Sequence, residues 1–361
     1  MKQTCILVLG MHRSGTSALT GTLGLLDVYL GHELLKPQDD NIKGFYENQK
    51  IVDINEKIFK DIGTYWHDLF YNQEKLNISN KNLMEELKAI LIEEFEFSNV
   101  FSIKDPRLAY LFPVYAKVLE ELNIDIKIVL PYRNPIEVAN SLNKRDNFSL
   151  EKGMLLWAYH FLLAEKYSRG YDRVFVEFDE LISSTDSVVE NISKRLDLKL
   201  ITKYKKKKKE ISEFLEPSLK HHNISADNLS HKAPSIVRNV LALKERFNED
   251  SFDKEFDTLR EDLFSYQKLF YNREIVNSLD EGQRAKEHLA QKEQELNKTK
   301  EHLAQKEQEL NKTKEHLAQK DKFIQKQQEE IEALKDELVL IYTSKSWKIT
   351  RILRKIKRLI K

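Results

Sequence analysis

CILVLGMHRSGTSALT, residues 5–20, is the stretch that decides the fold of this chain. It opens with a short apolar run that predicts a buried strand, and it passes through a turn between Gly10 and Gly15 into small residues that predict a helix. Glycine lets the chain turn sharply and lets a ligand approach the backbone closely. The free N–H groups at a helix start attract phosphate or sulfate, and Arg13 adds a planar two-pronged donor. The stretch therefore predicts an anion-binding loop.

The loop nearly matches the nucleotide-triphosphate signature GxxxxGK[ST]. Gly10, Gly15 and Ser17 occupy signature positions, but Thr16 stands where the signature has a lysine. Enzymes that hydrolyse triphosphates need that lysine at the β- and γ-phosphates. The loop therefore favours an oxyanion other than ATP or GTP, and a P-loop nucleotide kinase or NTPase remains the alternative.

Strand and helix signals alternate around the loop, which predicts an α/β fold: a P-loop parallel sheet flanked by helices. The expected strands are residues 5–9, 100–103, 126–131 and 173–178, and the expected helices are residues 16–26, 51–61, 83–95, 113–122, 135–144 and 150–168. Ligands of open α/β sheets bind beyond the carboxyl ends of the strands. Arg133, which follows the third strand, is therefore expected in the same crevice as the loop.

Four motifs together resemble the P-loop sulfotransferase family, in its bacterial type, which is related to tyrosylprotein and carbohydrate sulfotransferases. The motifs are GMHRSGTSAL (10–19), GFYEN (44–48), KDPRL (104–108) and YRNPIEVANSLNKRD (132–146). The resemblance covers roughly residues 1–200. It implies an enzyme that moves a sulfuryl group from 3′-phosphoadenylyl sulfate to a hydroxyl acceptor, with no metal required.

The resemblance also implies which residues hold the donor. Arg13 would bind the 5′-phosphosulfate and stabilise the leaving oxygen. The loop residues that would add backbone N–H groups are Ser14, Gly15, Thr16 and Ser17. Arg133 and Ser141 match the family's site for the 3′-phosphate, an arginine just past a strand and a serine eight residues later.

Two glutamates are candidates for the catalytic base. Glu47 lies in GFYEN, as in the bacterial relatives, and is slightly favoured; Glu33 follows a stretch similar to tyrosylprotein sulfotransferases. A glutamate accepts a proton efficiently only where it is partly desolvated. His32 and His67 are weaker alternatives. In KDPRL, the charged residues either line the cleft or form an ion-pair network.

Composition sets further bounds. The net charge of +1 gives no reason to expect a nucleic-acid partner. The lone cysteine, Cys5, falls in a predicted core strand. His221, His222 and His231 are the nearest approach to a metal cluster, and they lack a ligand spacing. With no signal peptide and no membrane-length apolar run, we expect a cytoplasmic protein, either free or peripheral on the inner face of the membrane.

A 14-residue unit, KEHLAQKEQELNKT, occurs at residues 286–299 and again at 300–313. Leucine or isoleucine recurs every seventh residue from 289 to 338, which predicts a coiled coil over residues 283–341 and hence a homo-oligomer. The sulfotransferase-like domain is expected to occupy residues 1–275. A non-catalytic membrane-tethered scaffold is another alternative. Residues 205–209 are five lysines, for which we expect a solvated loop.

Residues 342–361 predict a basic amphipathic helix. Residues 345–361 hold eight basic side chains and no acidic one, and Trp347, Ile349, Ile352 and Ile356 recur at nearly helical spacing. Such a helix is typical of an anionic membrane surface, although it would also suit docking on the globular domain or continuing the coiled coil. The stretch 344–354 resembles tails of bacterial cell-surface polysaccharide enzymes. The resemblance makes a surface polysaccharide or glycolipid the expected acceptor.

Overall fold

The structure is a computed structural model, and it describes residues 2–36, 44–70, 76, 80–215, 233–249, 253–270 and 273–359. The chain divides into two compact units, Met1–Tyr271 and Asn272–Lys361. Each unit is described by itself.

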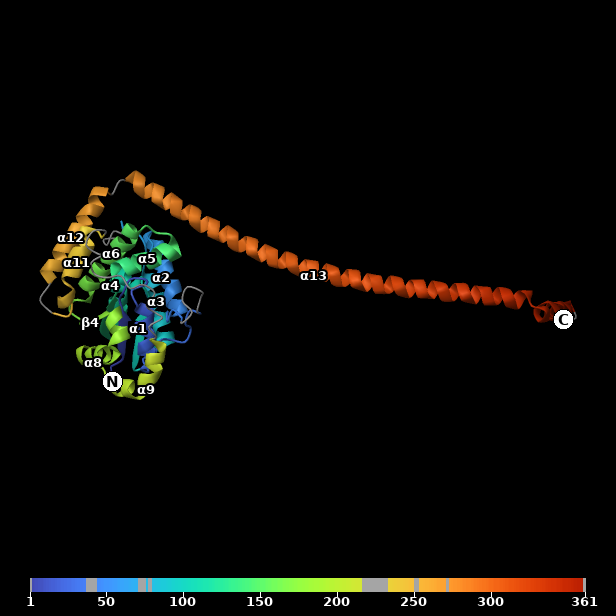
Figure 1. Cartoon of the computed structure of the whole chain (residues 1–361), viewed down its shortest axis with the longest axis horizontal. Helices are drawn as coiled ribbons and strands as arrows, with labels where there is room; N and C mark the ends of the chain where they lie inside the picture. The colour runs from blue at the N-terminus through green and yellow to red at the C-terminus, as the bar shows by residue number, and fades with distance from the viewer. Residues whose placement is uncertain are drawn as a thin grey trace. The chain divides into compact units, whose positions relative to one another are not determined.

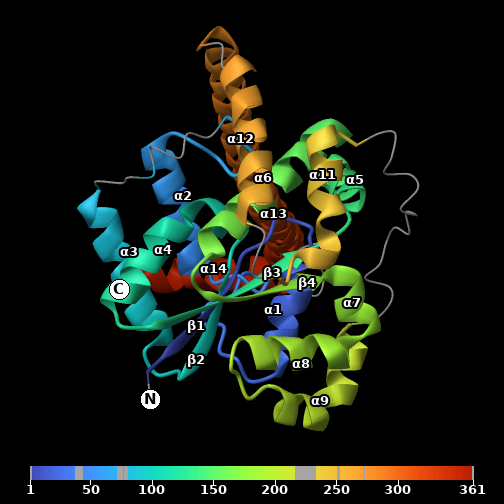
Figure 2. The same ribbon diagram turned by 90° about the vertical axis from the view of Figure 1, so that its left-hand side faces the viewer.

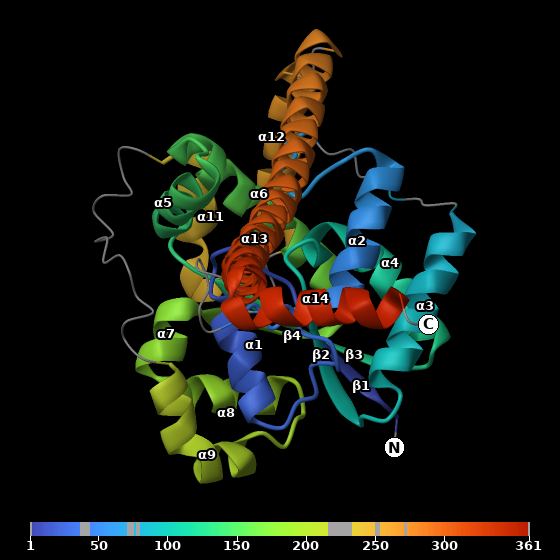
Figure 3. The same ribbon diagram turned by 90° about the vertical axis from the view of Figure 1, so that its right-hand side faces the viewer.

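A parallel sheet forms the centre of the first unit (Figures 2 and 3). Its strands are β1 (Thr4–Val8), β2 (Val100–Lys104), β3 (Asp125–Tyr132) and β4 (Asp172–Glu177), in the order β2-β1-β3-β4. All three neighbouring pairs are parallel, and Cys5 of β1 lies between Phe101 and Ile126. The predicted α/β fold with a parallel sheet is confirmed.

Helices cover both faces of the sheet because side chains alternate along each strand. Cys5 and Leu7 face one core, while Ile6 and Val8 face the other. The second core is closed by α1 (Thr16–Leu25), α8 (Thr185–Arg195) and α9 (Ile201–Phe214). The first core is closed by α2 (Gln49–Ile62), α3 (Lys81–Phe95), α4 (Leu108–Glu121), α5 (Pro135–Asp146), α6 (Leu150–Ser168), α11 (Ser235–Ala242) and α12 (Asp253–Phe270). Two further short helices among the described residues are α7 (Phe178–Ser183) and the 3-10 helix η4 (Lys244–Arg246).

Two expectations about helices are wrong. The helix expected from Pro113 begins at Leu108, so the proline lies inside it. Asp105 forms the turn before this helix: its side chain accepts from the Arg107 N–H at 2.8 Å and its carbonyl from the Leu108 N–H at 2.9 Å. The buried helix thus forms despite the hydrogen bond that Pro113 cannot donate.

The five lysines expected in a loop lie in α9 instead. Tyr204 and Ile211, two turns apart, are buried on either side of the lysines, and they hold the segment to the core. Lys207 also donates to Asp27 at 2.7 Å and Lys208 to Asp186 at 2.6 Å. The charged run is therefore helical together with the apolar residues on either side of it, which pack in the second core.

The expected core residues are buried. Trp157 and Tyr159 are fully enclosed in the first core, and so is Cys5. Burial raises the pKa of the Cys5 thiol well above its usual value, which makes it a poor nucleophile.

The second unit consists of two helices, α13 (Arg273–Thr343) and α14 (Lys345–Leu359). Figure 1 shows α13 as one continuous helix. The leucine stripe of the predicted coiled coil is exposed on it, from Leu289 to Leu338. Pairing with another chain therefore remains a prediction. None of the described helices has both the length and the apolar character that crossing a membrane requires.

Candidate anion-binding site

Three strand ends meet at the site. β1 lies between β2 and β3, so the loop that leaves β1 is flanked on one side by Lys104, the last residue of β2. Arg133, the residue after β3, flanks it on the other side. The sheet order therefore brings two cations from distant parts of the sequence to the loop that is predicted to bind an anion.

The loop can be built only with glycine at two positions. At Gly15, φ is +85° and an added Cβ would lie 2.4 Å from Phe178 Cδ2. At Gly10, an added Cβ would lie 2.8 Å from Thr16 Cγ2. Gly15 is also the N-cap of α1, and no side chain caps that end. The first N–H groups of α1 are therefore available to an anion.

Arg13 and Ser141 are in direct contact. The Arg13 side chain, on a residue with φ +67°, donates from Nε to Ser141 Oγ at 2.7 Å. Ser141 lies about two turns into α5, whose start is fixed by Pro135 and by the Asn134 side chain accepting from the Ile136 N–H at 3.0 Å. The two residues that the resemblance assigns to opposite ends of the donor thus belong to one continuous site.

Arg133 is buried between α5 and α7, with 9% of its surface exposed. Its Nε donates to Glu137 Oε2 at 2.7 Å, and its guanidinium lies 4.5 Å from the centre of the Phe178 ring. The same Phe178 ring contacts the position where Gly15 lacks a Cβ. Phe178 therefore packs between the loop and Arg133, a role that no sequence motif signalled.

Several buried polar atoms around the loop have no hydrogen-bond partner among the described residues: His12 Nε2, Ser14 Oγ and Arg133 Nη2. Leaving such an atom unsatisfied costs about 1–3 kcal/mol. Burial, followed by the charges of Arg145 and Arg107, lowers the pKa of His12 well below its usual value, so its ring is neutral. The Ser14 hydroxyl and the Arg133 Nη2 are therefore suited to donate hydrogen bonds to an oxyanion.

Lys104 and Glu47 form a second polar group beside the start of α1. The Lys104 Nζ donates to Glu47 Oε1 at 2.5 Å, to the Phe45 carbonyl at 3.0 Å and to Ser17 Oγ at 3.2 Å. Burial raises the pKa of the Glu47 carboxyl, and the charge of Lys104 opposes that rise. A cation thus reaches Ser17 from β2, although the loop itself has Thr16 in place of lysine.

The backbone segments that contain Glu33 and Glu47 are hydrogen-bonded to each other. The Gln49 N–H donates to the Glu33 carbonyl at 2.7 Å, and the Leu35 N–H donates to the Glu47 carbonyl at 2.8 Å. The Glu33 side chain is exposed, whereas that of Glu47 is buried. Desolvation of the kind a base needs is therefore present at Glu47 and absent at Glu33.

The remaining candidates have other partners. His32 is exposed beside Glu94, and the His67 ring lies 3.5 Å from the Lys152 Nζ. Asp105 accepts from Arg107 at 3.0 Å and from Asn55, so this part of KDPRL is an ion-pair network. The histidines 221, 222 and 231 lie outside the described residues. Within the described part of the chain, no group of three or more His, Cys, Asp or Glu could hold a metal.

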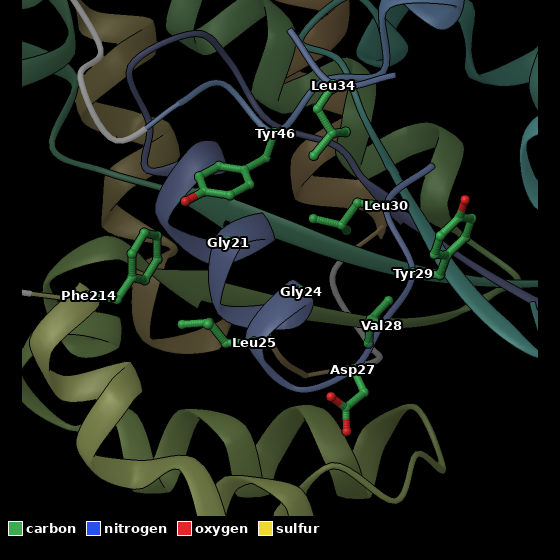
Figure 4. Close-up of a pocket in the computed structure, with 10 residues that line it drawn as sticks. All are labelled: Gly21, Gly24, Leu25, Asp27, Val28, Tyr29, Leu30, Leu34, Tyr46 and Phe214. Carbon is green, nitrogen blue, oxygen red and sulfur yellow. The ribbon is translucent and has the colours of Figure 1, made fainter. Parts of the chain in front are cut away.

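An open apolar pocket of about 420 Å³ lies beside the Glu47 segment. Figure 4 shows Tyr46 and Phe214 at one end of it, over Gly21, and Leu30 and Leu34 toward the other. Tyr46 has φ +55°, an uncommon conformation for a bulky residue. Its ring lines the pocket, while the next side chain in the sequence, Glu47, reaches Lys104. The pocket is apolar and does not suit an anion.

Comparisons with known proteins give structural similarity only. The chain matches no protein-family model and no curated protein sequence. The sulfotransferase domain of the Synechococcus PCC 7002 olefin synthase has a TM-score of 0.35 and 12% identity, over 72% of this chain and 95% of that one.

Two further structures are similar. Sulfotransferase STF1 from Mycobacterium tuberculosis H37Rv has a TM-score of 0.33 and 13% identity, over 69% of this chain and 77% of its own. The sulfotransferase domain of the curacin biosynthetic pathway has a TM-score of 0.32 and 11% identity, over 73% of this chain and 98% of that one. All three structures are of the family that the sequence motifs resemble.

Proposed function

We propose that this chain is a sulfotransferase that uses 3′-phosphoadenylyl sulfate as donor and a hydroxyl as acceptor. The observation that carries the proposal is the pair of buried polar atoms, Ser14 Oγ and Arg133 Nη2, that lack a partner within the described part of the chain. Ser14 directly precedes the uncapped start of α1. Arg133 lies on the other side of the Phe178 ring, which contacts both it and Gly15. A donor with a charged group at each end would satisfy them together.

The loop would hold the 5′-phosphosulfate. Backbone N–H groups from Gly15 to Ser17 and the positive end of α1 attract it, whereas the Ser14 N–H donates to the Met11 carbonyl at 3.2 Å. The Arg13 guanidinium stabilises charge on the leaving oxygen. Arg133 and Ser141 would hold the 3′-phosphate. Held at both ends, the donor presents its sulfur in line to the acceptor.

Glu47 would act as the base. The acceptor oxygen attacks sulfur and forms the new S–O bond, and the bond from sulfur to the bridging oxygen breaks, which releases adenosine 3′,5′-bisphosphate. The hydroxyl proton passes to the Glu47 carboxylate. Lys104, which donates to Glu47, keeps the buried carboxylate ionised and ready to accept that proton.

The acceptor would be a carbohydrate of a cell-surface polysaccharide or a glycolipid. Support comes from the resemblance of residues 344–354 to tails of polysaccharide enzymes. The apolar pocket beside Tyr46 and Phe214 suits a lipid-like or ring portion of such an acceptor, because it lies next to the Glu47 segment.

We also propose that α13 joins identical chains. Leu289, Leu296, Leu303 and Leu310 repeat at seven-residue intervals and are all more than half exposed. Burial of such a stripe against a second copy would remove apolar surface from water.

A nucleotide kinase remains a second candidate, because one observation favours it. The Lys104 Nζ lies 3.2 Å from Ser17 Oγ, so a lysine from β2 could replace the lysine missing from the loop at Thr16. Such an enzyme would bind ATP with Mg²⁺ in preference to adenosine 3′,5′-bisphosphate.

Calorimetric titration of the full chain separates these functions. We expect adenosine 3′,5′-bisphosphate to bind, and Arg133→Ala to weaken binding at least about tenfold. The control is Arg260→Ala, which removes an equally buried arginine paired with Asp257 on α12. Preference for ATP with Mg²⁺ would support the kinase, and binding of neither nucleotide would indicate the scaffold.

A further inference from the structure

Helix α14 is a separate element from the long α13. The helical backbone is interrupted at Ser344, which belongs to neither helix. The Trp347 N–H donates to Ser344 Oγ at 3.1 Å, which is the bond that an N-cap serine makes. A new helix therefore begins after Ser344.

The coiled-coil pattern also ends at this break. Seven residues after Leu338 stands Lys345, and seven after Ile341 stands Lys348. Lysine at the position that leucine or isoleucine holds from Leu289 to Leu338 would place an ammonium group in an apolar interface, which is costly. The apolar residues of α14 therefore serve a different contact from those of α13.

The two faces of α14 differ in chemistry. At 3.6 residues per turn, one face carries Ile349, Ile352, Leu353 and Ile356, with exposed fractions of 61%, 62%, 59% and 47%. Basic residues flank and oppose it, and the helix has no acidic residue. Exposed apolar side chains bordered only by positive charge match a surface that is apolar beneath an anionic layer.

Trp347 lies on the basic side of α14, not with the isoleucines. The Arg354 guanidinium lies 4.1 Å from the centre of its ring, and the Tyr342 ring centre lies 4.9 Å away. The reason is helical geometry, since Trp347 and Ile349 are two positions apart in the sequence, which turns them to opposite faces of the helix. The sequence pattern placed Trp347 on the same face as the isoleucines, and the structure places it on the other face.

We propose that α14 binds in the plane of an anionic lipid surface. Its isoleucines and Leu353 would enter the boundary between headgroups and acyl chains, while Arg351, Lys355 and their neighbours contact lipid phosphates. A helix of 15 residues spans only about 22 Å, which is shorter than a membrane core of roughly 30 Å. The helix therefore lies along the surface.

Charge favours lipid over the two other occupants of this face. Docking on the chain's own globular unit would need acidic partners for seven basic residues of α14. A coiled-coil partner would be an identical basic helix, which repels. A surface of anionic lipids supplies many phosphates at once, and each basic residue near it contributes about fivefold in affinity.

Sedimentation of the full chain with vesicles tests the proposal. Vesicles of phosphatidylcholine with phosphatidylglycerol should bind the protein, and vesicles of phosphatidylcholine alone should not. Arg351→Glu with Lys355→Glu should lower partitioning by at least about 30-fold. The matched control, Lys298→Glu with Lys312→Glu, makes the same charge change on the exposed surface of α13 and should bind like the unaltered protein.

A second pair of variants tests the apolar face. Ile352→Ser with Ile356→Ser should lower partitioning at least about tenfold. Val339→Ser with Leu340→Ser, which removes exposed apolar residues of α13 outside the seam, should not. Absence of binding to phosphatidylglycerol vesicles would overturn the proposal. So would unchanged binding of the isoleucine variant, because charge alone would then explain adsorption.

Discussion

The Arg13 side chain donates from Nε to Ser141 Oγ at 2.7 Å, which joins the loop after β1 to the second turn of α5. A serine hydroxyl accepts one hydrogen bond while its own hydrogen remains free to donate. Ser141 can thus accept from Arg13 and donate to a phosphate at once. This contact makes the proposed 5′- and 3′-ends of the donor site one connected structure.

Ser141→Ala should weaken binding of adenosine 3′,5′-bisphosphate by about tenfold or more, because a hydrogen bond to a charged phosphate is lost. Thermal stability should change little, since Ser141 is only half-buried. Calorimetry measures the affinity. Ser187→Ala, at an exposed position on α8, should bind as the unaltered chain does; equal affinity in both variants would remove Ser141 from the site.

Gly15→Ala should destabilise the protein more than Gly63→Ala. Both glycines have positive φ, +85° and +66°, and both substitutions cost about 1–2 kcal/mol in backbone strain. Only at Gly15 does the added Cβ also meet Phe178, since Gly63 has nothing within 4 Å. Denaturant unfolding measures the difference. Equal losses of stability would show that Phe178 does not pack against the loop.

The sulfuryl-transfer rate should rise with pH through a pKa above the usual glutamate value. Burial raises the pKa of Glu47, and only its ionised form accepts a proton. Glu47→Gln should lower kcat by about 10²–10⁴-fold and leave nucleotide affinity nearly unchanged. Glu33→Gln is the control for this variant, and a rate loss there instead would move the base to Glu33.

The same shift predicts the pH dependence of stability. Between the usual glutamate pKa and the raised value, the folded chain binds more protons than the unfolded chain. The stability contributed by protonated Glu47 is therefore full at low pH and is lost as pH rises through the raised pKa. Denaturation across this range should show a smaller slope in Glu47→Gln. An identical slope would mean that Glu47 titrates normally.

Leu303→Asp should shift the full chain toward the monomer in analytical ultracentrifugation. Leu303 belongs to the exposed stripe, and a carboxylate there would be buried without a partner in the proposed pair. Gln308→Asp introduces the same charge outside the stripe and should leave the mass unchanged. A monomeric unaltered chain would exclude pairing through α13.

What the sequence predicted well was local. The anion-binding loop is contiguous in the chain, so its strand, its glycines and the start of its helix could be recognised together. Arg133 was expected near the loop because it follows a predicted strand, and β3, the strand before it, does neighbour β1. Its role in binding stays a prediction. The α13 helix was evident from its repeat.

The features that the sequence did not predict depend on contacts between residues that are far apart in the chain. Phe178 lies against Gly15 only because β4 ends near the loop, and no motif encodes that approach. The Lys104–Glu47 contact requires β2 to neighbour β1. The lysine run of α9 became helical because Tyr204 and Ile211 found a core, which overrides the preference of a charged run for solvent. Trp347 was grouped with the isoleucines, although its distance of two positions from Ile349 places it on the opposite face of a helix.

A crystal structure of the full chain with adenosine 3′,5′-bisphosphate tests the central claim most directly. We expect the 5′-phosphate on the N–H groups that begin α1, and the 3′-phosphate within hydrogen-bonding distance of Arg133 Nη2 and Ser141 Oγ. A nucleotide bound away from residues 13–17, or one whose 3′-phosphate does not contact Arg133, would contradict the account.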